Sequence, residues 1–396
     1  MNSTKPFSPF TLEKSWGFHN PVKVSFGRGV RQNLAQEFAG KTCLIVTTQR
    51  GRRQLTDDYL LGAFAADEEH IWVDTVTENP GLLALETTVE ALRNQRFDAI
   101  VAFGGGSSID SAKVLAIALS SQCAGRALRD LLAHPELHHG AQTRPLYAVP
   151  TTAGTGSEVT PFATVWDHEK RKKHSLAGPA VFPYAAYVDP ALTDTAPEAI
   201  TLSTGLDAIN QAAESIWNNN ATPITLELAT RALQLGFGVL PGLVAGEDGG
   251  LRARDQMAEC SLLAGLAISQ TRTALCHSMS YPITAHFGVP HGLACAYTMP
   301  AVLEHNLAAD DGRFINLAAR MANGNEAHES LMARFSELND RLGVAARIRQ
   351  YVSAADDLQA LTADMVTPGR VDNNLAPVTP HDIRRVLRRA SASSLQ

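Results

Sequence analysis

Three segments in the second half of the chain carry polar side chains that could bind a metal ion. Asp207 and Gln211 lie four residues apart in STGLDAINQAAESIW, so both fall on one face of a helix. His277 lies in TALCHSMSYP, and His286 and His291 lie in HFGVPHGLACA. A carboxylate, imidazoles and an amide oxygen suit a divalent borderline cation such as Fe²⁺ or Zn²⁺. Any one of these histidines, taken alone, is more often a structural or surface residue than a ligand.

Two clusters of glycine and hydroxyl side chains could bind the phosphates of a nucleotide. In AIVAFGGGSSIDSAK three glycines end a strand, and Ser107 then opens a helix. Glycine N–H groups can approach a phosphate closely, and the N-terminus of a helix adds a partial positive charge. The segment is not the GxGxxG dinucleotide motif, because Ile109 occupies the last glycine position. Each cluster alone could be a tight turn, but a second one after another strand, PTTAGTGSEVT over residues 150–160, favours a nucleotide.

The residues after the run CLIVT bear on the choice of nicotinamide cofactor. Thr48 comes first, then Arg50, Arg52 and Arg53, with no acidic residue among them. An acid in such a place holds the ribose 2′-OH of NAD, whereas a basic residue suits the 2′-phosphate of NADP. The pattern favours NADPH bound near Thr48 and Arg50. NADH is the alternative cofactor, and the arginines could also be surface residues that contact only solvent.

The elements that must position these residues change character halfway along the chain. Short apolar runs predict strands at 22–26, 43–47, 71–76, 99–103 and 146–149, with helices at 82–96 and 107–120. This alternation predicts a parallel sheet with helices on both faces. Later segments are Ala/Leu-rich with helical spacing, at 204–217, 223–239, 251–268, 330–342 and 380–390. We therefore expect an α/β dinucleotide-binding domain over 1–195, an all-helical metal- and substrate-binding domain over 196–396, and a site in the cleft between them.

Composition narrows the class of protein further. The 396 residues carry a formal net charge of -6 and no long basic run, which argues against nucleic acid as the main partner. The five cysteines form no CxxC pair, so a disulfide framework or zinc-thiolate site is not expected. The N-terminus lacks signal-peptide features, and no stretch of 18 apolar residues occurs. These features predict a cytoplasmic protein without a membrane span.

Four ordered motifs give the chain a family resemblance. GGGSSIDSAK, PTTAGTGSEVT, TGLDAxxxAxE and HxMxYPxxxHFGVPHG together resemble the iron-containing (group III) alcohol dehydrogenases, over nearly the whole chain. The resemblance implies the dehydroquinate synthase-like fold, with a divalent metal in the cleft held by one Asp and three His. By position, these ligands include Asp207, His277 and His291. Gln211 stands where the family has the remaining His, so the metal is retained with a weaker ligand or lost.

The resemblance also implies cofactor contacts and an assembly. The implied nucleotide contacts are Gly105, Gly106, Ser107, Asp110, Thr151, Thr152, Thr155, Thr160 and, at the ribose, Lys173. Asn79 in the TENP turn matches a family position beside the substrate. Tyr281 stands where many members have another His; it could pass a proton to the product alkoxide or simply pack. A homodimer through the N-terminal strands is expected.

The implied chemistry is reduction of an aldehyde. The metal would polarise the carbonyl as a Lewis acid while hydride arrives from the nicotinamide. TPFATVWD, GLDAINQAAESIWN and Gln211 resemble the phosphonoacetaldehyde reductase (hydroxyethylphosphonate dehydrogenase) branch, which implies a short anionic aldehyde. Arg272 is the candidate clamp for a phosphonate tail, since guanidinium binds such groups bidentately, although an ordinary surface ion pair is as good an account. His286 and Thr164 are further candidates for the same pocket.

Several alternatives remain open at this point. Sulfoacetaldehyde is the nearest rival substrate, followed by a plain short-chain alcohol or a lactaldehyde-type substrate. Dehydroquinate synthase and glycerol-1-phosphate dehydrogenase share the fold, but their ligand pattern differs from TGLDAxxxA and GVPHG. A non-catalytic cofactor-binding protein without metal is the alternative of another class.

Overall fold

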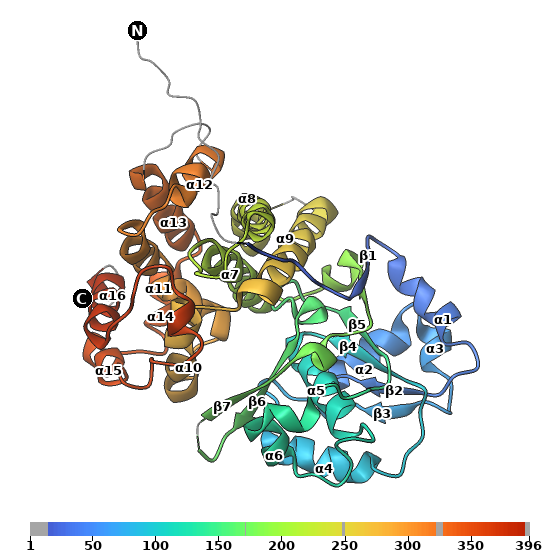
Figure 1. Ribbon diagram of the computed structural model, residues 1–396. Helices are drawn as coiled ribbons and strands as arrows, with labels where there is room; N and C mark the ends of the chain where they lie inside the picture. The colour runs from blue at the N-terminus through green and yellow to red at the C-terminus, as the bar shows by residue number, and fades with distance from the viewer. Residues whose placement is uncertain (1–14, 171, 248–249, 322–327, 393–396) are drawn as a thin grey trace.

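A six-stranded parallel sheet forms the core of the N-terminal half (Figure 1). The computed structural model describes residues 15–170, 172–247, 250–321 and 328–392. The strands run in the order β1-β8-β5-β4-β2-β3, and each neighbouring pair is parallel. Their bounds are β1 Lys23–Phe26, β2 Cys43–Val46, β3 Ile71–Val73, β4 Ala99–Gly104, β5 Leu146–Pro150 and β8 Ala185–Val188. The predicted parallel sheet is confirmed.

Helices cover both faces of this sheet, as the strand–helix alternation predicts. Along β4, Ile100 and Ala102 pack into one apolar cluster with α4 and α5, while Val101 and Phe103 pack into another with α1, α2 and α3. This alternation follows from the twofold repeat of side chains along a strand. The helices are α1 Asn33–Glu37, α2 Gln49–Asp57, α3 Gly62–Ala65, α4 Leu82–Leu92, α5 Gly106–Ala118 and α6 Leu128–Ala133.

Two elements of this half are absent from the sequence expectations. An antiparallel hairpin, β6 Phe162–Asp167 and β7 Lys172–Ala177, lies on the side of the α/β half that faces the helical half (Figure 1). Strand β8 is inserted between β1 and β5. Short strands with charged residues, such as KKHSLA in β7, carry too weak an alternation to be recognised from sequence.

The C-terminal half is helical throughout its described residues, apart from an isolated bridge between Asn218 and Asn374. Its helices are α7 Glu198–Ile216, α8 Pro223–Ala245, α9 Gly250–Thr271, α10 Leu275–Phe287, α11 His291–Leu307, α12 Arg313–Met321, α13 His328–Arg341, α14 Val344–Ile348, α15 Ala355–Ala360 and α16 Pro380–Ala392. They share one large apolar core. Helix α7 begins at Glu198, directly after Pro197, which is earlier than the apolar spacing predicts.

Helix α8 is the one described helix long and apolar enough to cross a membrane, judged by length and composition alone. In the structure Ala229, Leu233 and Leu240 on this helix are fully buried in the helical core. Thr222 caps its N-terminus in a capping box with Thr225. The apolar face of α8 is therefore occupied by packing against neighbouring helices.

Candidate active site

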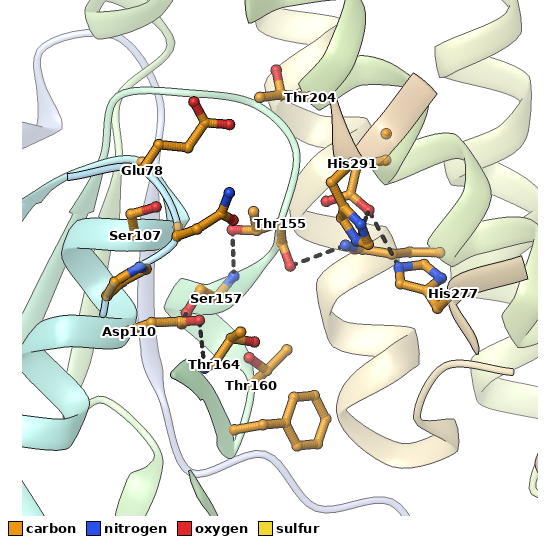
Figure 2. A pocket seen from close by; sticks show the side chains of 18 of the residues that line it. Glu78, Ser107, Asp110, Thr155, Ser157, Thr160, Thr164, Thr204, His277 and His291 are labelled. Carbon is orange, nitrogen blue, oxygen red and sulfur yellow. Dashed lines mark hydrogen bonds and ion pairs between the residues drawn. The ribbon is translucent and has the colours of Figure 1, made fainter. Parts of the chain in front are cut away.

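A cavity of about 390 Å³ lies between the two halves, lined by the N-terminus of α5, the hairpin β6–β7 and helices α7, α10 and α11 (Figure 2). Most of the predicted site residues line it: Thr48, Asn79, Gly105, Gly106, Ser107, Asp110, Thr152, Thr155, Thr160, Thr164, Lys173, Asp207, Gln211, Arg272, His277, Tyr281 and His291. The fold thus brings together residues from both halves of the chain.

Three predicted residues do not line this cavity. Arg50 is exposed on the first turn of α2 and donates to the carbonyl oxygen of Thr195 at 3.3 Å. Thr151 continues the ladder of β5, its N–H donating to Gly104 O at 3.0 Å. His286 is exposed near the end of α10, because nine residues after His277 a helix presents the opposite face. The structure thus does not bring these three residues into the cavity, where the sequence places their cofactor- and substrate-binding roles.

The glycine-rich turn at the N-terminus of α5 has the close packing that a phosphate-binding turn needs. Gly104 has a positive φ of 152°, which side chains rarely adopt. A Cβ atom on Gly106 would lie 2.5 Å from Thr155 Cγ2, and one on Gly105 would lie 3.1 Å from Thr152 Oγ1. No side chain caps this helix, so its first N–H groups face the cavity for an anion to bind.

Asp110 holds the second cluster against α5. Its Oδ1 accepts from Ser157 Oγ at 2.6 Å, and its Oδ2 accepts from Thr164 N at 2.8 Å. Beside it, the buried Lys113 donates to Ser157 Oγ at 2.9 Å and to the carbonyl oxygens of Thr160 and Phe162 at 2.8 Å each. Burial raises the pKa of Asp110 and lowers that of Lys113 to about 8. Asp110, expected at the cofactor, thus lines the cavity and also hydrogen-bonds to Ser157 and Thr164, which line the same cavity.

Asp207, His277 and His291 converge at the helical side of the cavity. Nε2 of His277 lies 3.3 Å from Asp207 Oδ1, and Nε2 of His291 lies 3.9 Å from the same atom. Burial lowers the pKa of His291 to about 3, which keeps the imidazole neutral and its lone pair free. Burial opposes ionisation of Asp207, but the neighbouring imidazoles of His277 and His291 lower the pKa of the carboxyl overall.

Glu214 lies behind His277, two turns after Asp207 on α7. Its Oε2 accepts from His277 Nδ1 at 2.8 Å, and it also accepts from the N–H groups of Ala274 and His277 at 2.6 and 3.1 Å. Burial alone would lower the pKa of His277, but Glu214 and Asp207 raise it to about 10. A cation ligand must be deprotonated at the coordinating atom, so Nε2 would lose its proton on metal binding while Nδ1 keeps its own.

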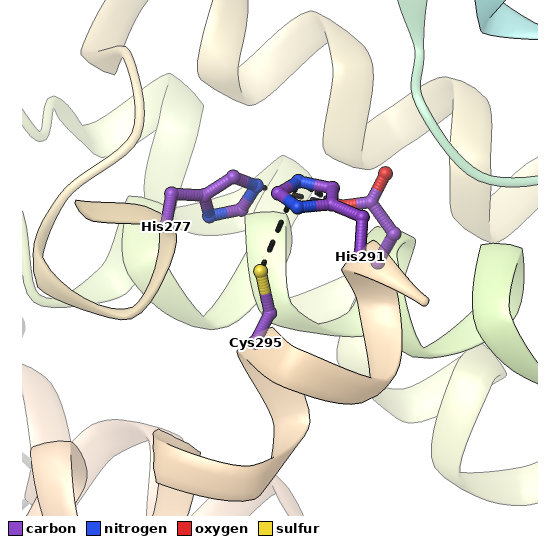
Figure 3. A group of neighbouring side chains, drawn as sticks. His277, His291 and Cys295 are labelled. Carbon is purple, nitrogen blue, oxygen red and sulfur yellow. Dashed lines mark hydrogen bonds and ion pairs between the residues drawn. The ribbon is translucent and has the colours of Figure 1, made fainter. Parts of the chain in front are cut away.

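The donor atoms fit a divalent cation. Asp207 Oδ1 and Gln211 Oε1 are both buried without a hydrogen-bond partner among the described residues. Unsatisfied buried oxygens are rare in proteins and point to an absent ligand. Ligand atoms of Asp207, His277, His291 and Cys295 all lie within 4.8 Å of one another (Figure 3). Cys295 was not predicted; it follows His291 by one helical turn, with Sγ 3.9 Å from its Nε2.

Cationic side chains surround the part of the cavity beside Tyr281. The Tyr281 ring stacks on His291 at 5.9 Å between centroids, and Lys173 Nζ lies 3.7 Å from the centroid of Tyr281. Burial would raise the pKa of Tyr281, but Lys173 and Arg370 lower it to about 7. Arg272 also lines this region. Burial and the neighbouring Arg370 both lower the pKa of Arg272.

Besides Cys295, sequence reasoning missed three residues that matter here. Glu214 is part of the quoted motif TGLDAxxxAxE, and its spacing of two helical turns from Asp207 was the available signal. Lys113 stands in GGGSSIDSAK, but only the structure shows it to be buried. Arg370 precedes the short helix Val371–Asn373 and reaches the cavity from a loop far away in sequence, so no local signal marks it.

Two family profiles match the chain. Iron-containing alcohol dehydrogenase matches residues 21–190, and the C-terminal profile of the Fe-containing alcohol dehydrogenase family matches residues 201–391. The solved iron-containing alcohol dehydrogenase of Thermotoga maritima superposes with a TM-score of 0.81 and 29% identity, covering 95% of this chain and 99% of that one. The sulfoacetaldehyde reductase of Bifidobacterium kashiwanohense, solved with NAD⁺, has a TM-score of 0.83 and 27% identity, covering 96% and 100%.

Curated relatives add activities to the family match. The NADPH-dependent butanol dehydrogenase of Clostridium saccharobutylicum is 29% identical over 340 residues, 84% of this chain and 86% of the relative. The phosphonoacetaldehyde reductase of Streptomyces viridochromogenes is 33% identical over 311 residues, 75% of this chain and 77% of the relative. The names of these relatives share oxidoreductase chemistry and differ in substrate.

Proposed function

Because this chain belongs to the iron-containing alcohol dehydrogenase family and is an NAD(P)-linked alcohol or aldehyde oxidoreductase, we propose that it reduces a short aldehyde with an anionic tail. The specific reaction we propose is phosphonoacetaldehyde to 2-hydroxyethylphosphonate with NADPH. The single observation that carries this proposal is a group of three cationic side chains beside the cation site: Lys173, Arg272 and Arg370.

The three cations share the cavity with the carboxylates of Glu78, Asp110 and Asp207, but none of them pairs directly with an acid in the described part of the chain. No ion pair joins Lys173, Arg272 or Arg370 to a carboxylate among the described residues, whereas Arg28, Arg52, Arg320 and Arg389 each have one. Three cationic side chains without a direct ion-pair partner favour an anionic ligand, and a phosphonate dianion interacts with them more strongly than a monoanion. Guanidinium groups also match the geometry of phosphonate oxygens.

The backbone at Arg272 supports a role for its side chain. Arg272 has a φ of 63° at the end of α9, a left-handed conformation that is unfavourable for a residue with a side chain. Asn218 Nδ2 and Thr271 Oγ1 both donate to the carbonyl oxygen of Arg272 at 3.1 Å. The helix end therefore holds this strained turn, from which the side chain reaches the cavity.

Different residues of the chain would have different roles in the proposed reaction. Gly105, Gly106 and Ser107 would bind the pyrophosphate at the N-terminus of α5. Asp207, Gln211, His277 and His291 would hold Fe²⁺ or Zn²⁺, which supplies Lewis-acid polarisation of a carbonyl when bound. Tyr281, with its pKa lowered to about 7 by Lys173 and Arg370 against the effect of burial, is the group available to give a proton to the product alkoxide.

Two observations favour NADPH over NADH: the residue type at position 48 and the cofactor named for one relative. Thr48, not an acid, lines the cavity after β2, where an acid would repel a 2′-phosphate. The butanol dehydrogenase relative is NADPH-dependent. The arginines of α2 give little support, since Arg50 donates to Thr195 O and Arg52 pairs with Asp74 at 2.7 Å. NADH is the alternative, because the sulfoacetaldehyde reductase was solved with NAD⁺.

Sulfoacetaldehyde is the second candidate substrate. It carries a sulfonate in place of the phosphonate, and a structural neighbour reduces it according to its name. A plain alcohol or lactaldehyde-type substrate would leave Arg272 without an anion to bind. A metal-free, non-catalytic protein is disfavoured by the unsatisfied oxygens of Asp207 and Gln211.

Assembly and location are also part of the proposal. Val24 and Phe26 are exposed on β1, the edge strand of the sheet, which supports a homodimer through this edge. All five cysteines are unpaired and buried, which fits a reducing, cytoplasmic compartment.

Binding of an anion without an aldehyde group tests the anionic pocket directly. We expect ethylphosphonate to inhibit NADPH-dependent aldehyde reduction competitively against phosphonoacetaldehyde, more strongly than ethanesulfonate, with the inhibition lost in Arg272→Ala. Equal, negligible inhibition by both anions would contradict the proposal.

A further inference from the structure

The side-chain amide of Gln211 faces two different partners. Its Nε2 donates to the carbonyl oxygen of Thr155 at 3.3 Å, while its Oε1 is buried without a hydrogen-bond partner among the described residues. Only the NH₂ end of a glutamine amide can donate to a carbonyl oxygen, so the end facing Thr155 O is the NH₂ group. The oxygen therefore lies on the other side of the amide from the NH₂ group and, without a hydrogen-bond partner among the described residues, is available to a cation.

The loop that contains Thr155 is closely packed against three helices. A Cβ atom on Gly106 of α5 would lie 2.5 Å from Thr155 Cγ2, and one on Gly154 would lie 2.5 Å from Thr204 Cβ of α7. A Cβ on Gly156 would lie 2.4 Å from Gly265 Cα of α9. With so little free space, the loop cannot shift at one contact without shifting at the others.

Thr155 therefore stands between the two sites of the cavity. On one side its side chain contacts the phosphate-binding turn, and on the other its carbonyl oxygen accepts from the cation ligand Gln211 (Figure 2). Its Oγ1 also accepts from Ser157 N at 3.2 Å, and Ser157 is fixed to Asp110 of α5. In the described part of the chain Gln211 is the proposed cation ligand that hydrogen-bonds to this loop, whereas His277 bonds to Glu214 and His291 contacts Ser280.

We propose that Gln211 couples the two sites, so that cation binding through Oε1 and nucleotide binding at the α5 turn strengthen each other through Thr155. This inference rests on the proposed function for its cation and nucleotide, and it adds a positioning role that a ligand alone would not have. Binding at Oε1 orders the amide, the amide fixes Thr155 O, and the loop is then held in the position that the nucleotide contacts. By thermodynamic linkage, the factor must be the same in both directions.

Charge alone is the competing explanation, since a dication attracts the phosphates of a nucleotide without any contact through Gln211. Two variants separate the two accounts. Gln211→Glu keeps an oxygen ligand and loses the N–H donor to Thr155. Gln211→Met keeps a neutral side chain of similar length and loses the donor, while Asp207, His277 and His291 remain to hold the cation.

The experiment measures NADPH binding by calorimetry to metal-free and Zn²⁺-loaded protein. We expect Zn²⁺ to tighten NADPH binding about fivefold, at the lower end of common couplings. A chelator competition should show NADPH tightening Zn²⁺ by the same factor. In both Gln211 variants, NADPH affinity with and without Zn²⁺ should differ by less than twofold. Gln270→Glu is the matched control, because Gln270 donates to His19 O outside the cavity, and it should keep the fivefold factor.

Two outcomes would overturn the inference: a wild-type factor within twofold, or a full fivefold factor retained in Gln211→Met, which assigns the coupling to charge. Aldehyde turnover on the same preparations keeps the two proposals apart. A wild-type preference for phosphonoacetaldehyde without coupling overturns only the role of Gln211. Coupling without that preference overturns only the proposed substrate.

Discussion

Glu214 and His277 are joined by a buried hydrogen bond of 2.8 Å from Nδ1 to Oε2, with the two side chains 0% and 4% exposed. The bond fixes the imidazole so that Nε2 faces Asp207 Oδ1. Carboxylates placed in this way orient metal-binding histidines and raise their basicity. Glu214 thus acts on the cation site without contacting the cation.

Replacing Glu214 is expected to weaken metal binding. Glu214→Ala should raise the Zn²⁺ dissociation constant by about 10- to 100-fold, with Glu214→Gln smaller because it keeps the shape and one acceptor. Competition with a fluorescent chelator measures this. Glu227→Ala removes an exposed partner of Arg320 and is the control. Unchanged Zn²⁺ affinity in Glu214→Ala would show that the orientation of His277 does not depend on this bond.

Replacing Arg272 is expected to change selectivity. Arg272→Ala should lower kcat/KM for phosphonoacetaldehyde by about 10- to 100-fold, because the variant loses one or two charge-assisted hydrogen bonds to the substrate. The rate with propionaldehyde should stay within about twofold, and Arg272→Lys should recover part of the loss. Steady-state kinetics on both aldehydes measure the ratio. An equal fall for both substrates would mean that Arg272 supports the helix end and not the tail.

The buried Lys113 is expected to contribute strongly to stability. Lys113→Met leaves Asp110 and four oxygen acceptors without their cation, so the free energy of unfolding should fall by about 3–5 kcal/mol. Urea denaturation measures this, and Lys41→Met, at an exposed lysine, should stay within about 0.5 kcal/mol. A change as small as the control would show that the loop is held mainly by packing.

Acid is expected to destabilise the fold partly through His70. Burial lowers the pKa of His70 below its ordinary 6.5, and Nε2 has no hydrogen-bond partner among the described residues. Below pH 6.5 the unfolded chain therefore binds a proton that the folded chain resists, so stability falls as pH decreases. His70→Phe, which can pack on Phe64, should lose less stability between pH 7 and pH 5. Parallel pH dependence in both proteins would exclude this histidine.

The sheet and the cation group could be predicted from sequence for physical reasons. Apolar runs such as CLIV must be buried on both faces, which only a covered parallel sheet provides. Asp207 and Gln211 at helical spacing had to share a face, and α7 presents both to the cavity. Family motifs supplied the pairing of these residues with His277 and His291, which lie on separate helices.

Residues whose role depends on long-range packing could not be predicted. Arg370 enters the cavity from a loop, and Lys113 is buried by contacts with residues 157–162. His286 was expected near the substrate because it lies close to His291 in sequence, but the end of α10 exposes it. Hairpin β6–β7 and strand β8 were missed because short strands have little periodicity to detect.

The most direct test of the proposed function is the rate of NADPH oxidation by Zn²⁺- or Fe²⁺-reconstituted protein with phosphonoacetaldehyde, sulfoacetaldehyde and propionaldehyde under one set of conditions. Three cavity cations without direct ion-pair partners predict the highest kcat/KM for phosphonoacetaldehyde, a lower value for sulfoacetaldehyde and the lowest for propionaldehyde. Propionaldehyde turned over as well as the anionic aldehydes would contradict the anionic-substrate account and leave a general alcohol dehydrogenase of this family.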